Sequence, residues 1–134
     1  MCDKIIEPIN ISSYSNDWLG RALTNPTWGS KKIDNKVYFD VETQYKKNKS
    51  NNLDYNKRML EDMITMLKLI IIKFNKHPEL LYEINNRGGL FFLEKCSHNV
   101  GVKNSRWEGS GKNSKFIVVL CKAYEIVNKK INVV

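Results

Sequence analysis

Arginine is scarce in this chain, although the chain is strongly basic. Its 134 residues carry a formal net charge of +8, yet its only arginines are Arg21, Arg58, Arg87 and Arg106. Proteins that read guanines and grip phosphates with two parallel hydrogen bonds favour arginine over lysine. The composition therefore argues against a specialised reader of nucleic-acid sequence. The positive charge still leaves a basic nucleic-acid-binding module open as one alternative.

Cysteine and long apolar runs are scarce as well. The three cysteines, Cys2, Cys96 and Cys121, are odd in number and form no Cys-x-x-Cys pair, so neither a disulfide framework nor a zinc site is predicted. The first residues lack the basic patch and apolar run of a signal peptide, and no apolar stretch reaches the roughly 18 residues that span a bilayer. We expect a cytoplasmic protein with no membrane partner, no metal and no cofactor.

The remaining composition is that of one globular domain over residues 1–134, with 42% hydrophobic and 27% charged residues. Its patterns predict a mainly α fold with a minor β part. Residues 36–39 favour a brief strand or extended segment, and residues 97–113 an irregular loop. Helices are predicted at residues 41–47, 54–75, 78–87, 90–96 and 114–130.

The longest predicted helix has an unusually wide apolar stripe. Methionine, isoleucine and phenylalanine side chains recur there at helical spacing, and a second set of apolar residues widens the stripe. These residues are Met59, Met63, Met66, Ile70 and Phe74, with Leu60, Ile64, Leu67 and Ile71 beside them. A stripe this wide predicts a central, largely buried helix.

The sharpest local motif runs from Trp107 to Ser114 and leads into the last helix. Gly109 and Gly111 would let the backbone approach a ligand closely, and the helix N-terminus, with Asn113 or Ser114 as its cap, offers unpaired N–H donors to a phosphate. Trp107 offers a flat surface for stacking. The alternative is a plain turn before a helix, with Trp107 as a core residue.

Glu42 is the candidate catalytic carboxylate. It lies between Val41 and the aromatic Tyr45 at the start of a predicted helix, and an apolar setting there would suit its carboxyl group to proton transfer. The alternative is a solvated helix-surface glutamate that interacts with the helix dipole. Asn25 either contacts a ligand or starts a turn before Pro26.

Taken in order, these segments resemble the NADAR superfamily, which includes the YbiA-like proteins and the riboflavin-pathway N-glycosidases. The matching segments span about residues 20–127. They are Leu23-Thr24-Asn25-Pro26, Asn35-Lys36-Val37-Tyr38, Glu42-Thr43-Gln44-Tyr45, Met63 through Lys73-Phe74, His77-Pro78-Glu79-Leu80, Leu93-Glu94 and Trp107-Glu108-Gly109-Ser110-Gly111. The family has a mainly helical fold and breaks N-glycosidic or ADP-ribosyl bonds.

The resemblance implies a site with Glu42 as the catalytic carboxylate. It implies Trp107 as a stacking residue and further ligand contacts from Asn25, Tyr45 and Lys73, to which we add Arg21 and Arg106 as sources of charge. The sequence departs from the family pattern at Thr43, which replaces a histidine, and before Trp107, where an aspartate is missing; Glu108 is the candidate replacement for that acid.

Three functions follow as alternatives. The first is a hydrolase acting on an ADP-ribose-derived nucleotide or on a ribosylated base, free or within ADP-ribosylated nucleic acid. The second is a catalytically silent protein that sequesters an NAD-derived nucleotide. The third is the basic nucleic-acid-binding module named above.

Overall fold

The computed structural model describes residues 6–24, 37–101 and 105–132. The fold is mainly helical, as predicted, with one small two-stranded sheet. Its elements are α1 (Trp18–Leu23), α2 (Val41–Asn48), α3 (Tyr55–Lys76), α4 (Pro78–Arg87), α5 (Leu90–Lys95), β1 (Ser97–His98), β2 (Gly109–Ser110), the 3₁₀ helix η1 (Gly111–Asn113) and α6 (Lys115–Asn132). Of these elements, α1, the two strands and η1 were not predicted.

The helix ends follow local chemistry. Asp40 and Asp54 precede α2 and α3 as N-caps, and each side chain accepts a hydrogen bond from the backbone N–H of the third residue of its helix. Pro78 opens α4, and the pair Gly88 and Gly89 ends it with φ values of 128° and 66°. These boundaries agree with the sequence predictions to within two residues.

The sheet lies where an irregular loop was predicted. Ser97 pairs with Ser110 and His98 with Gly109 in an antiparallel register, and Asn10 bridges Ser97 from the N-terminal segment. Of the two alternatives for residues 36–39, a brief strand or an extended segment, the strand is wrong for the described part, residues 37–39. No strand in the described ranges pairs with this part, and the backbone N–H of Phe39 donates instead to Nε2 of His77, at 3.0 Å.

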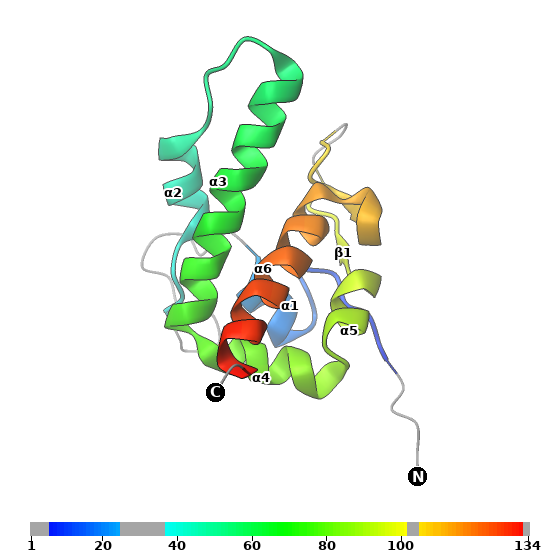
Figure 1. The fold of residues 1–134 in the computed structure, drawn as a ribbon. Coiled ribbons are helices and arrows are strands. Elements are labelled where there is room, and N and C mark those ends of the chain that lie inside the picture. The colour runs from blue at the N-terminus through cyan, green and yellow to red at the C-terminus, as the bar shows by residue number, and fades with distance from the viewer. Residues whose placement is uncertain (1–5, 25–36, 102–104, 133–134) are drawn as a thin grey trace.

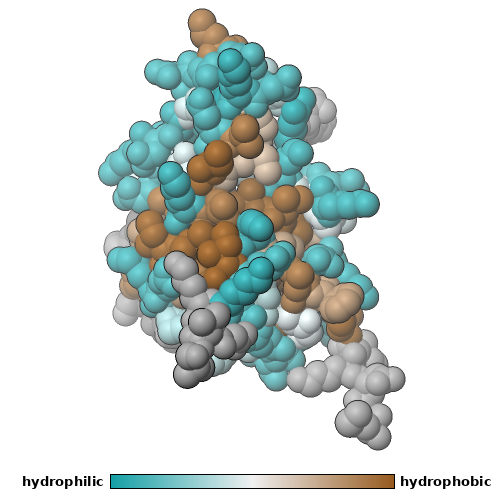
Figure 2. Space-filling model, in the orientation of Figure 1, coloured by the Kyte–Doolittle hydropathy of each residue, from teal (hydrophilic) through white to brown (hydrophobic). Residues whose placement is uncertain are grey.

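Helix α3 is only partly central. Its C-terminal half packs against α6, and Ile70 and Phe74 there are buried. Its N-terminal half extends with α2 beyond the rest of the protein (Figure 1), so Leu60 and Ile64 are 60% and 44% exposed. The prediction of a largely buried helix was therefore wrong for the first turns. Figure 2 shows hydrophobic residues at the surface over α3 and α6.

The core forms where α1, α4 and α5 close around α6 and the second half of α3. Its fully buried side chains include Phe74, Phe92, Phe116 and Leu120. None of the helices in the described ranges combines the length and apolar character that crossing a bilayer requires.

Candidate functional site

Helix α2 presents Glu42 and Tyr45 one turn apart, which places the two side chains on neighbouring positions of one face. Glu42 is half-buried, and its carboxylate forms an ion pair with Lys46 at 3.7 Å. Of the two alternatives for Glu42, these surroundings are closer to the solvated helix-surface glutamate than to the apolar setting. Thr43, at the position of the family histidine, is exposed, and its hydroxyl donates to the Asp40 carboxylate at 2.7 Å.

Tyr45 joins this helix to Trp107. The edge of one ring meets the face of the other, with centroids 5.8 Å apart and an interplanar angle of 80°. Trp107 packs partly against the core, so only part of its indole remains accessible. Glu42 and Trp107, 65 positions apart in sequence, therefore both neighbour Tyr45.

Asp62 is a buried carboxylate that the sequence analysis missed. It lies on α3, accepts the backbone N–H of Ser50 at 2.7 Å, and hydrogen-bonds through its side chain to Tyr45. Burial, followed by the negative charges of Asp62 and Glu42, raises the pKa of Tyr45 to about 12. The phenol is protonated at neutral pH, and its one proton is donated to the Asp62 carboxylate.

Lys73 is the second charged residue buried on α3. It follows Asp62 by three helical turns on the same buried face, roughly 16 Å along the axis. Its Nζ donates to the carbonyl oxygen of Thr24 at 2.9 Å and lies 5.8 Å from the Tyr38 ring centroid. Burial lowers the pKa of Lys73 to about 7, and the charge of Asp40 opposes that shift. The sequence contains a signal for both residues, because each is a charged side chain at the helical spacing of the apolar residues of α3.

The motif from Trp107 to Ser114 is held by contacts within the protein. The carbonyl oxygens of Arg106 and Trp107 accept from the backbone N–H groups of Lys115 and Phe116, at 3.0 and 3.4 Å. The Ser114 hydroxyl accepts from Ile117 N–H at 3.2 Å and donates to the Trp107 carbonyl. These first donors of α6 are engaged by the loop itself, so a phosphate here would be bound by side chains.

Gly111 allows a close approach between backbones. Its N–H donates to the Cys96 carbonyl at 2.9 Å, its φ is +54°, and a Cβ there would lie 2.8 Å from the carbonyl oxygen of Glu94. We expect Gly111→Ala to lower the free energy of unfolding by about 2–4 kcal/mol, since it adds both a left-handed alanine and a clash. Urea unfolding measures this loss.

Gly101→Ala is the matched control for this substitution. Gly101 also has a positive φ, of +89°, but no described neighbour lies within 4 Å of its built Cβ. Gly101→Ala should lower the free energy of unfolding by only about 1–2 kcal/mol, because it adds a left-handed alanine without a clash. Equal losses in the two variants would show that the close approach at Gly111 contributes nothing.

The other predicted residues have separate positions. The Arg106 guanidinium lies over the Tyr55 ring, 4.3 Å from its centroid, at the start of α3. Asn113 is exposed on η1. Glu108 accepts from Val100 N–H at 2.8 Å and so closes the β1–β2 hairpin.

Two further predictions concern the α1 region. Arg21 lies on α1, and its guanidinium donates to the Ser15 carbonyl at 2.9 Å. Asn25 lies outside the described residues. Its neighbour Thr24 is fully buried, accepts from Lys73 through its carbonyl, and has no hydrogen-bond partner among the described residues for its hydroxyl.

The arrangement thus brings Glu42, Tyr45, Asp62 and Trp107 together, with Lys73 further along the buried face of α3, beside Thr24 and Tyr38; these five residues are called the candidate site below. It combines a half-exposed carboxylate, a protonated phenol and a flat indole. Comparison of the chain with protein-family models, with curated proteins and with solved structures found no match.

Proposed function

We propose that the protein hydrolyses an N-glycosidic or ADP-ribosyl bond in a nucleotide derived from NAD or ADP-ribose, or in a ribosylated base. The contact of Tyr45 with Trp107 carries this proposal, because it places a carboxylate-bearing helix beside an indole that can stack on a base. The resemblance of residues 20–127 to the NADAR superfamily points to the same chemistry.

Glu42 supplies the charge that the reaction needs. Cleavage of an N-glycosidic bond passes through a state with positive charge on the ribose ring, and a nearby carboxylate stabilises that charge while orienting the attacking water. The Glu42 carboxylate, about one third exposed, is accessible to such a substrate. The carboxylate also forms an ion pair with the exposed Lys46, 3.7 Å away on the same helix.

Tyr45 and Asp62 have positioning roles in this proposal. The Asp62 carboxylate fixes the Tyr45 phenol, which in turn fixes the orientation of the Trp107 indole. Asp62 is a second carboxylate at the site, where the family aspartate before Trp107 is missing. Arg106, exposed beside Trp107, is the side chain best placed to meet a phosphate.

A catalytically silent binder is the second candidate. The hydroxyl and backbone N–H of Thr43 both donate to the carboxylate of Asp40, the N-cap of α2, and a threonine does not supply the proton-transfer group of the family histidine. A site that keeps its stacking surface and loses a proton-transfer group would bind a nucleotide without turnover. The third candidate, a basic nucleic-acid-binding module, would show steep salt dependence and indifference to mononucleotides.

A ligand screen by thermal shift tests the proposal. NAD, ADP-ribose, cyclic ADP-ribose and ribosylated bases are added separately, and a ligand at 100 times its dissociation constant should stabilise the fold by about 2.7 kcal/mol. Trp107→Ala should abolish the shift for the same ligand. Product analysis of the ligands that bind distinguishes cleavage from capture, and the absence of a shift with every ligand would refute a nucleotide site.

A further inference from the structure

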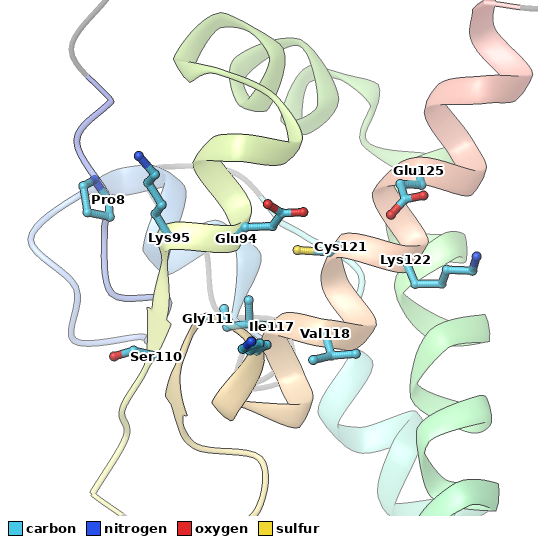
Figure 3. A pocket seen from close by; sticks show the side chains of 11 residues that line it. Pro8, Glu94, Lys95, Ser110, Gly111, Ile117, Val118, Cys121, Lys122 and Glu125 are labelled. Carbon is cyan, nitrogen blue, oxygen red and sulfur yellow. The ribbon is translucent and has the colours of Figure 1, made fainter.

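A hollow lies on the surface outside the candidate site, and none of the five candidate-site residues lines it. It has a volume of about 1020 Å³, and its walls come from the N-terminal segment, the end of α5, β2, η1 and one face of α6 (Figure 3). Its apolar lining is formed by Pro8, Ile117, Val118 and Cys121. We call this hollow the α5–α6 groove. Concave sites of several hundred cubic ångströms with apolar walls and a few polar groups are typical of small-molecule binding.

Two carboxylates converge inside the α5–α6 groove. Glu94 comes from α5 and Glu125 from α6, one turn after Cys121, and Figure 3 shows both side chains directed toward the Cys121 thiol. Burial raises the pKa of Cys121 to about 12, and the charges of Glu94, Cys96 and Glu125 add to that rise. The thiol therefore experiences a negative field, in a protein whose net charge is +8.

Three lysines, Lys95, Lys112 and Lys122, also line the hollow. The ammonium groups of Lys95 and Lys122 point away from Cys121 in Figure 3, whereas the two carboxylates are directed toward it. Neither Glu94 nor Glu125 forms an ion pair with any residue in the ranges that the structure describes.

We propose that the α5–α6 groove binds a small organic cation that joins an ammonium group to an apolar body. The ammonium group lies between the Glu94 and Glu125 carboxylates, and the apolar body packs on Ile117 and Val118. Val118 is 39% exposed in the free protein, so a ligand would bury its side chain. This site is independent of Glu42 and Trp107, which lie outside the groove walls.

Octylamine and octanoate are matched probes for this proposal, because they share one alkyl chain and carry opposite charges at neutral pH. We expect saturable octylamine binding that perturbs the backbone amide NMR signals of residues 117–125. Octanoate should bind at least about tenfold more weakly, since each charge-assisted hydrogen bond contributes enough to produce such a ratio.

Variants of the groove residues test which charges bind the ammonium group of octylamine. The double substitution Glu94→Gln and Glu125→Gln should weaken octylamine binding about tenfold or more and leave octanoate unaffected or improved. Lys122→Gln is the matched surface control and should leave octylamine affinity within about twofold of wild type. Circular dichroism and thermal midpoints verify that every variant is folded.

Several results would overturn the inference: equal binding of the two probes, full octylamine affinity in the double variant, or signal changes confined to residues outside the groove. Glu42→Gln should leave octylamine binding unchanged. Failure of the nucleotide proposal and failure of the α5–α6 groove proposal are therefore separately visible.

Discussion

Glu42→Gln is expected to lower the kcat for N-glycosidic cleavage by about 10²–10⁴-fold, the range for loss of a catalytic acid or base. Glutamine keeps the shape of the side chain and its place beside Tyr45, but it carries no charge for an oxocarbenium-like state. The dissociation constant of a nucleotide substrate should change by only a few-fold, because the stacking surface of Trp107 remains. Product formation by chromatography and binding by calorimetry measure the two quantities.

Two further glutamates serve as comparisons. Glu7 is exposed on the N-terminal segment, so Glu7→Gln should leave kcat unchanged. Glu108→Gln tests the candidate replacement acid, whose carboxylate bonds to Val100 N–H. Full activity in Glu42→Gln would remove this carboxylate from the mechanism, and no product from the wild-type protein despite tight binding would favour the sequestering function.

The buried Lys73 should make wild-type stability rise with pH above neutrality. Its pKa falls from an ordinary value of 10.5 to about 7 in the folded protein. Between these two values the unfolded chain binds more protons than the folded one, so the free energy of unfolding increases with pH. Over pH 7–8.5 the free energy of unfolding should increase by about 1–2 kcal/mol. At low pH, where the folded protein must bury the charged amine, the full pKa shift corresponds to a loss of about 5 kcal/mol of stability.

Lys73→Met removes the titrating group and keeps the length of the side chain. Urea titrations at pH 7 and pH 8.5 measure how much the free energy of unfolding rises between these pH values. This rise should be smaller in the variant than in the wild type by about 1–2 kcal/mol, the contribution of Lys73. Cys96 and Cys121 titrate in both proteins, so their contributions cancel in the difference.

Lys76→Met is the matched control for the pH experiment. Lys76 lies in the last turn of α3, is exposed, and has its ammonium group 5.4 Å from the Phe39 ring centroid. It should retain the wild-type pH dependence. A Lys73→Met protein with the same pH dependence as wild type would mean that the buried amine does not titrate in this range.

The sequence predicted the helices well because their signals are local. Asp40, Asp54 and Pro78 mark helix starts, and Gly88 marks a stop, through bonds and dihedral preferences that involve only neighbouring residues. Helix α1 was missed because its six residues are too few to show a period, whereas the equally short α5 was found because the pair Gly88 and Gly89 marks its start. The two strands were missed because two residues are also too few to show an alternating pattern. They pair with each other and with Asn10, which is far away in sequence.

The candidate site was predictable only in part. The order of Glu42 and Trp107 along the chain suggested a shared location, and their common neighbour Tyr45 supports it. The sequence could not reveal that the N–H groups at the start of α6 bond to loop carbonyls, because that pairing depends on tertiary structure. Asp62 was overlooked because an acidic residue on a wide apolar helix is ordinarily read as solvated.

The backbone carbonyls of Arg106 and Trp107, which cap the first turn of α6, couple the position of the Trp107 side chain to the stability of that turn. Arg106 and Trp107 stay in place only while the first turn of α6 is helical, since their oxygens accept from Lys115 and Phe116. Fraying of that turn would loosen the contact of the indole with Tyr45 and so disturb the proposed ligand surface in the same event. Any molecule that stacks on Trp107 must therefore also tighten the beginning of α6, and so carry its effect toward the centre of the protein.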